Sequence, residues 1–255
     1  MGLWSKHNGI WKEVSFANKM SDKDFYLCCG GPSLKKITQE KIRVPGALII
    51  AMNNAYPYIR PDIWIGMDHP HCYHRQIFWE PFVKIMRGGF QTKTCEGVEI
   101  CENYNLFYAD VRKYHDWGAE LFKPPTKETN FIWKKNVMTV AIHILFYLGA
   151  KKINIVGCDL AHTNSSHYHD ENVKLNAHQA NWNQRTYNEI FSFLKFVVPK
   201  AKKRGIEINS CTPESRINEI MPYVPIEEAL SKTQEKVVFN GKLYHSSFVP
   251  DDPTR

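Results

Sequence analysis

The sequence predicts an α/β protein: a single domain with a Rossmann-like, mostly parallel twisted sheet, helices on both faces and a lid-like insertion. Continuous apolar runs that are too short for helices recur along the 255 residues, as is typical of strands buried on both faces. An apolar helical stretch over 137–148 leads through Gly149 directly into another such run. Connections this short indicate α/β crossovers, which place parallel strands side by side.

Three segments are predicted from the change in pattern along the chain. Residues 1–24 have no clear period and are interpreted as a leader or a strap over the core. Residues 25–229 form the Rossmann-like domain, with a lid or insertion at about 69–135. Residues 230–255 form a C-terminal tail, in which Asn240-Gly241 favours a hairpin that begins with Val237-Val238-Phe239.

The first half of the chain alternates apolar runs with turn residues. Strands are predicted over 25–29, 47–51, 63–67 and 106–109. Between and after them we expect a short helix or 3₁₀ turn over 33–41, a short helix over 81–90, a hairpin over 91–103 and a loop or lid over 110–135.

The second half has a stronger signal. Asn136 can cap a helix that runs from Val137 to Leu148, and Gly149 suits its C-terminus. This helix is apolar on most faces, so we expect it in the centre of the domain. A strand over 153–157, a helix over about 178–203 and a strand over 206–209 follow.

Composition and charge limit the classes of protein to which this chain can belong. Hydrophobic residues make up 43% of the chain and charged residues 23%, as in an ordinary globular protein. No stretch of about 18 apolar residues predicts a membrane span, and no signal peptide is visible. The seven cysteines are an odd number, with two adjacent in a predicted strand, which favours reduced thiols and a cytoplasmic location. The net charge of +7 favours an acidic partner such as a nucleotide.

The turn Gly30-Gly31-Pro32-Ser33 directly follows the first strand of the predicted domain. Two glycines allow a tight turn and a close approach to a ligand, and the backbone N–H groups of such a turn favour an anion. The alternative is a strand–turn–helix joint that binds nothing, because short glycine motifs recur by accident.

Other predicted strands also end in small polar groups. Asn53-Asn54 follows the second strand, Asp68 the third, and Asp159 the strand after the central helix. Ligands of such sheets bind outside the carboxyl ends of the strands. These residues and the glycine turn are therefore predicted to form one site.

Three blocks resemble a known superfamily. They are CGGPSLKKI, AMNNAYPYIRPDIWIGMDHP and NVMTVAIHILFYLGAKKINIVGCDLAHTNSSHYHD, in this order between positions 28 and 170. They are similar to the superfamily that joins motility accessory factors, 6-hydroxymethylpterin diphosphokinase-like proteins and bacterial CMP-sialic-acid-dependent sialyltransferases. Cys29 stands where that superfamily has the first glycine of its G-x-G turn.

The resemblance implies a Rossmann-like, nucleotide-binding transferase and suggests roles for single residues. For the nucleotide and donor it implies Gly30, Gly31, Pro32, Ser33, Asn53, Asn54, Thr139 and Asp159, with Thr139 against a phosphate. Asp68 is a further donor-site candidate because it follows a strand end. Tyr168 is a further donor-site candidate, as a residue that stacks on a ring or covers one. For the catalytic base it implies His167, or alternatively His169 or His178.

The first prediction of function is a glycosyltransferase that moves a sugar from a nucleotide-activated donor to a hydroxyl acceptor. Such a reaction needs a base for the acceptor hydroxyl and dipoles or cations for the departing phosphate, and it requires no cofactor. The acceptor is a glycan, a protein or a modified nucleic-acid base, and a homo-oligomer is compatible with the sequence.

Two alternatives stay open. One is an Mg²⁺–ATP-dependent diphosphokinase of a pterin-like hydroxymethyl heterocycle, in which Asp68 and Asp159 would hold Mg²⁺. The other is a nucleotide-binding protein without catalysis.

Other conspicuous side chains have a structural interpretation. His143 lies inside the apolar helix and is predicted to be a satisfied core histidine. Trp182 and Tyr187 are expected to be packing residues of the last long helix. His69, His71 and His74 cluster, but the cysteine spacing does not match a zinc site.

Overall fold

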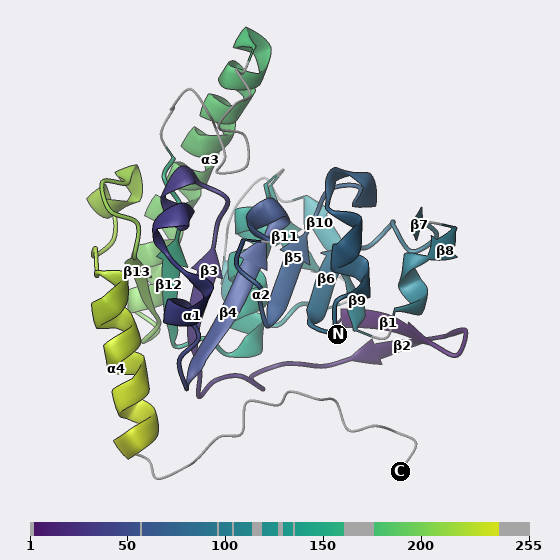
Figure 1. Ribbon diagram of the computed structural model, residues 1–255, viewed down its shortest axis with the longest axis horizontal. Coiled ribbons are helices and arrows are strands. Elements are labelled where there is room, and N and C mark those ends of the chain that lie inside the picture. The colour runs from purple at the N-terminus through teal and green to yellow at the C-terminus, as the bar shows by residue number, and fades with distance from the viewer. Residues whose placement is uncertain are drawn as a thin grey trace.

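The computed structural model describes residues 3–56, 58–95, 97–103, 105–113, 119–126, 130–134, 136–160 and 176–239. Within them, one central sheet of nine strands has the order β13-β12-β3-β4-β5-β6-β9-β1-β2 (Figure 1). The strands are β1 (Leu3–His7), β2 (Ile10–Val14), β3 (Asp24–Cys28), β4 (Ala47–Met52), β5 (Ile63–Gly66), β6 (Val83–Arg87), β9 (Leu106–Ala109), β12 (Lys152–Val156) and β13 (Glu207–Ser210).

The sheet is mostly parallel, which confirms the predicted fold class. Every neighbouring pair from β13 to β9 is parallel. Only the end formed by β1 and β2 is antiparallel, and Figure 1 shows this hairpin at the opposite end of the sheet from β13.

Both faces of the sheet are buried, because side chains of a strand alternate between two cores. In β4, Leu48 and Ile50 belong to one core, while Ile49 and Ala51 belong to the other. The helices α2 (Val137–Leu148) and α3 (Ala177–Lys202) contribute to the first core. The helices α1 (Gln39–Ile42) and α4 (Ile226–Phe239) contribute to the second.

The central helix α2 begins and ends as the sequence predicts. The Asn136 side chain accepts a hydrogen bond from the backbone N–H of Thr139, so it satisfies one donor of the first turn. Gly149 follows the last turn with a φ of 95°, a left-handed conformation that suits glycine.

Smaller elements complete the domain. The hairpin of β7 (Thr94–Cys95) and β8 (Val98–Glu99) confirms the one predicted over 91–103. The strands β10 (Val111–Lys113) and β11 (Phe131–Trp133) form a separate parallel pair. The 3₁₀ helices are η1 (Pro32–Lys36), η2 (Asn53–Ala55), η3 (Pro70–Cys72), η4 (Arg75–Trp79), η5 (Ile100–Glu102), η6 (Ala119–Phe122) and η8 (Arg216–Glu219).

The helix predicted over 81–90 is wrong, because this segment holds strand β6. Its residues 83–86 are all buried, on both faces of the sheet. The charged residue of this run is Lys84, whose Nζ donates to the carbonyl of Phe82 at 3.0 Å and also to that of Glu80. Because this lysine interrupts the apolar run, the sequence pattern did not indicate a buried strand.

Two further segments differ from the expectation. The predicted leader forms β1 and β2, and Leu3 of β1 is fully buried in the core. The predicted lid over 69–135 contains β6 and β9, which belong to the main sheet. β1 (LWSKH) and β2 (IWKEV) mix apolar with polar and charged residues, so their strand character is weak in the sequence. β9 was predicted as a strand, and only its place in the main sheet differs from the expectation.

The start of the C-terminal tail is helical. Residues 237–239, predicted as a strand of a hairpin, end α4 instead. Burial of Ala229, Leu230 and Thr233 on one side of α4 explains why helical packing prevails here. The rest of that predicted hairpin, from residue 240 on, lies outside the described residues. No helix in the described part of the chain is long and apolar enough to cross a membrane.

Candidate functional site

A cavity opens where the direction of strand addition reverses. From β3 the chain adds strands on one side through β4, β5 and β6 to β9, and it later adds β12 and β13 on the other side of β3. Ligands of open α/β sheets bind at such a switch point, outside the carboxyl ends of the strands. The cavity at this point measures about 410 Å³, within the usual range for small-molecule sites.

The walls of the cavity come from strand ends and from two helices. After the strands it is lined by Cys29, Gly30, Gly31, Met52, Asn53, Asn54, Met67, Asp68, Gly157, Cys158, Asp159 and Leu160. From the other segments it is lined by Cys72, Tyr73, Trp133, Asn136, Val137, Met138, Trp182, Asn183, Thr186, Tyr187 and Ile190. The structure thus brings together most of the strand-end residues that the sequence predicts to meet.

The glycine turn is joined to Asp159. The backbone N–H and the hydroxyl of Ser33 both donate to Oδ2 of Asp159, at 3.2 and 2.9 Å. A Cβ on Gly31 would lie 2.0 Å from that oxygen and 2.5 Å from the carbonyl oxygen of Gly157. Only glycine at position 31 therefore allows the turn and the Asp159 strand end to approach this closely.

Hydrogen bonds within the protein already use several N–H groups of this turn. Gly31 donates to the carbonyl of Gly157 at 2.9 Å, and Leu34 donates to that of Gly31 at 3.0 Å. Ser33 is buried, and among the turn residues it is Gly30 and Gly31, rather than Pro32 and Ser33, that line the cavity. Contact of the whole turn with phosphates stays a prediction, and such contact would compete with Asp159 for Ser33.

Tyr73 links the ends of β4 and β5. Its hydroxyl accepts from the backbone N–H of Asp68 at 2.8 Å and donates to Oδ1 of Asn53 at 3.3 Å. Asn53 has a φ of 48°, and its carbonyl accepts from Nε1 of Trp64 at 2.7 Å. Burial raises the pKa of Tyr73 well above its ordinary value, so the hydroxyl stays protonated as a donor. The Asn53 side chain and the backbone of Asp68 are thereby held at the cavity.

The neighbouring Asn54 lines the cavity from the same strand end. Its Nδ2 donates to the carbonyl of Cys72 at 3.3 Å, which ties η2 to η3. Sequence reasoning did not identify Tyr73 or Cys72 as site residues. They lie beyond a strand end in a segment without periodicity, so only the fold reveals their position.

The first turn of α2 forms another wall, but Thr139 does not reach the cavity. Thr139 is fully buried, and its hydroxyl donates to Oδ1 of Asn136 at 2.9 Å. Asn136, Val137 and Met138 line the cavity in its place. The contact of Thr139 with a phosphate stays a prediction, whereas the positive end of the helix dipole does face the cavity.

One face of α3 closes the cavity. Trp182, Asn183, Thr186, Tyr187 and Ile190 follow the spacing of a single helix face. Trp182 and Tyr187 were expected to be packing residues. Tyr187 is partly buried and packs against the core, as expected, and it also lines the cavity, whereas Trp182 lines the cavity and is 58% exposed. The helical spacing was visible in the sequence, but nothing in it indicated which neighbour that face meets.

The predicted catalytic histidines are only partly described. His167, His169 and Tyr168 lie outside the described residues. His178 is exposed on the first turn of α3 and is not among the described residues that line the cavity. His143 is the satisfied core histidine that the sequence predicts: its Nδ1 accepts from the N–H of Ile132 at 3.0 Å, and its Nε2 lies 3.1 Å from the carbonyl oxygen of Lys123.

Two thiols lie side by side at the cavity. Cys29 and Cys158 are buried, and a hydrogen bond with Cys158, together with burial, raises the pKa of the Cys29 thiol. Both are free thiols. Among the described residues, no group of three or more His, Cys, Asp or Glu side chains is arranged to hold a metal ion. Binding of Mg²⁺ by Asp68 and Asp159 stays a prediction.

The described residues that line the cavity give it a negative charge. Asp68 and Asp159 line it, and none of the described lining residues is lysine or arginine. The positive end of α2 is therefore the favourable place for an anion, and the carboxylates suit the hydroxyls of a ribose or sugar.

Comparison with known proteins identifies no family for this chain. No family model matches it, and no curated protein matches it. Among solved structures, it is similar to the sialyltransferase CstII from Campylobacter jejuni in complex with CMP-3FNeuAc, with 14% identity, a TM-score of 0.43, and 81% of this chain and 88% of that chain covered. It is also similar to an alpha-2,3-sialyltransferase from Campylobacter jejuni in apo form, with 13% identity, a TM-score of 0.41, and coverage of 88% and 86%.

Proposed function

We propose that this protein is a nucleotide-dependent glycosyltransferase that moves a sugar from a nucleotide-activated donor to a hydroxyl acceptor. The observation that supports it is the cavity at the switch point between β3 and β12, where four strand ends, the first turn of α2 and one face of α3 meet. The three sequence blocks that resemble nucleotide-binding transferases contribute most of its strand-end walls.

The parts of the cavity suit the parts of a nucleotide sugar. The exposed ring of Trp182 offers a stacking surface for the base, and the amides of Asn53 and Asn54 offer hydrogen bonds. Asp68 and Asp159 accept hydrogen bonds from ribose or sugar hydroxyls. The phosphate belongs at the first turn of α2, because the N–H groups of Gly31 and Ser33 in the glycine turn already have acceptors.

The proposed reaction is a single displacement. The acceptor oxygen forms a bond to the anomeric carbon of the donor sugar as the bond from that carbon to the phosphate oxygen breaks. The base takes the proton of the acceptor hydroxyl, and the nucleotide leaves with the bonding electrons. The candidates for this base remain His167, His169 and His178.

A nucleotide-binding experiment tests the proposal. CMP, UDP, GDP, ADP and ATP are titrated with and without Mg²⁺, by thermal shift and calorimetry. At least one pyrimidine or guanine nucleotide should raise the melting temperature without Mg²⁺. The variant Trp182→Ala should weaken that binding by roughly 5- to 100-fold, because it removes base stacking. Trp79→Ala is the matched control, since Trp79 is 46% exposed and does not line the cavity.

Turnover then separates binding from catalysis. With the nucleotide sugar of the base that binds, release of the free nucleotide is measured for three single variants, His167→Ala, His169→Ala and His178→Ala. One of them should reduce kcat while it leaves the Kd of the nucleotide unchanged. Absence of binding by every nucleotide would contradict the proposal. Stabilisation by ATP only in the presence of Mg²⁺ would favour the diphosphokinase instead.

A further inference from the structure

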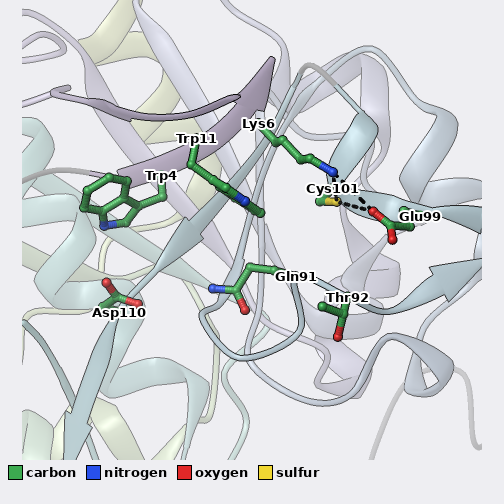
Figure 2. Close-up of a pocket in the computed structure, with 8 residues that line it drawn as sticks. All are labelled: Trp4, Lys6, Trp11, Gln91, Thr92, Glu99, Cys101 and Asp110. Carbon is green, nitrogen blue, oxygen red and sulfur yellow. Dashed lines mark hydrogen bonds and ion pairs between the residues drawn. The ribbon is translucent and has the colours of Figure 1, made fainter. Parts of the chain in front are cut away.

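A second cavity, of about 490 Å³, lies at the antiparallel end of the sheet, away from the switch point. Figure 2 shows the side chains that surround it, which come from β1, β2 and β8, from η5 and from the segments that follow β6 and β9. Neither the sequence blocks nor the proposed nucleotide site uses any of these residues.

The strand register places its aromatic side chains on one face. Trp4 and Lys6 are two positions apart in β1, so their side chains lie on the same face of the strand. Trp11 lies directly opposite Lys6 on β2, and Tyr108 lies opposite Trp4 on β9. Directly opposed residues share a face of an antiparallel pair. The rings of Trp11 and Tyr108 meet edge to face, with centroids 5.7 Å apart, and Trp11 remains 38% exposed.

A set of polar side chains faces these rings. Nζ of Lys6 lies 3.3 Å from Oε2 of Glu99, and the thiol of Cys101 donates to the same oxygen at 3.3 Å. The backbone N–H of Gly89 donates to Oε1 of Gln91 at 2.6 Å, which orients the Gln91 amide. Glu99 and Gln91 are therefore fixed by the protein before a ligand arrives.

Two buried donors of this cluster have no acceptor among the described residues. They are Nε1 of Trp4 and the hydroxyl of Tyr108. Figure 2 shows the indole nitrogen of Trp4 on the side of Asp110. The Tyr108 hydroxyl lies near Cys101 and Glu99, and burial raises its pKa well above the ordinary value, so it remains a donor. A buried donor without an acceptor costs stability, and because Trp4 lines the cavity, a ligand oxygen that reached its Nε1 would recover that cost.

We propose that this cavity binds a neutral carbohydrate, such as a hexose or N-acetylhexosamine unit of a glycan. A pyranose has an apolar C–H face that suits an exposed indole, and its rim of hydroxyls suits paired carboxylate, amide and indole N–H groups. The lining carries one cation, Lys6, against the two carboxylates Glu99 and Asp110. This excess of negative charge disfavours acidic sugars.

The carbohydrate site goes beyond the proposed nucleotide site and stands without it. Binding of cellobiose, lactose and di-N-acetylchitobiose to the full chain is measured by saturation-transfer NMR and by tryptophan fluorescence. At least one should bind, and glucuronic acid should bind more weakly. Trp11→Ala should weaken the binding by about tenfold through the loss of ring stacking. Gln91→Ala, in a loop, is the second variant and should weaken it as well.

The controls separate the two sites. Trp79→Ala and Trp182→Ala should leave carbohydrate binding unchanged, while Trp11→Ala should leave nucleotide binding unchanged. The proposal is overturned if none of the neutral sugars binds, or if Trp11→Ala and Gln91→Ala both bind them as the unaltered protein does. Preferential binding of tetramethylammonium at this cavity would overturn it too, because that result would identify an aromatic cage for cations.

Discussion

At the scale of single residues, the site depends on contacts that only small or hydrogen-bonded side chains permit. Gly31 leaves room for the Asp159 carboxylate, and Ser33 fixes one oxygen of that carboxylate by two hydrogen bonds. The sequence predicts these three residues as one site because they follow strand ends. It does not predict that they bind one another, since the separation of two strand ends depends on the whole sheet.

Replacing Ser33 tests this contact. Ser33→Ala removes the hydroxyl donor but keeps the backbone N–H bond to Asp159, so the free energy of unfolding should fall by about 1 kcal/mol. Urea unfolding measures the change. Ser192→Ala is the control, because the Ser192 hydroxyl is exposed and bonds only within α3, to the carbonyl of Asn188. Its effect should stay within about 0.5 kcal/mol. Equal losses in the two variants would mean that the contact with Asp159 contributes nothing.

At the scale of elements, the ends of α2 set the position of one wall of the switch-point cavity. Gly149 has positive φ, and a Cβ there would lie 2.9 Å from Cα of Asn18. Gly205, after α3, also has positive φ but would place its Cβ in open space. A substitution at Gly205 therefore introduces backbone strain alone, whereas a substitution at Gly149 introduces backbone strain and a steric conflict.

The pair Gly149→Ala and Gly205→Ala uses this difference. Gly205→Ala should lower the free energy of unfolding by roughly 1–2 kcal/mol, the cost of a left-handed residue with a Cβ. Gly149→Ala should cost more, because the segment around Asn18 must also move. Thermal and urea unfolding compare them, and a smaller loss in Gly149→Ala than in Gly205→Ala would show that the contact with Asn18 is readily relieved.

Elements of uniform apolar character were predictable, whereas elements of mixed character were predicted in some cases, such as β13 and α3, and missed in another, β6. The strands β3, β4, β5, β9, β12 and β13 and the helices α2 and α3 lie where the sequence predicts them. The segment of β6 was predicted as a helix because Lys84 interrupts its apolar run, although the lysine is buried and bonds to carbonyl groups. The face of α3 that lines the cavity was not predicted as part of the site, because the sequence shows that a helix has such a face but not which residues that face contacts in the fold.

At the scale of the whole molecule, a buried histidine makes stability depend on pH. Burial lowers the pKa of His143 from 6.5 to about 4. As the pH falls below 6.5, the unfolded chain binds a proton that the folded protein excludes. Stability is therefore fully present above pH 6.5 and is lost progressively towards pH 4, by up to about 3 kcal/mol.

Unfolding free energies measured between pH 7 and pH 4 check this dependence. His143→Asn should lower stability at pH 7 and flatten the pH profile, because it removes the titrating group. His74→Ala is the control, since His74 is exposed, and its profile should keep the slope of the unaltered protein. An unchanged slope in His143→Asn would assign the acid sensitivity to other groups.

The strand order also determines when each part of the sheet can form during synthesis. β3, β4, β5 and β6 are neighbours both in the chain and in the sheet, so they can associate as they emerge. β1 emerges first, but it pairs with β9 through Trp4 and Tyr108 and must wait for most of the sheet. β3 receives its second neighbour only when β12 has been made. We therefore expect both cavities to be completed late in folding, after an open sheet of central strands has formed.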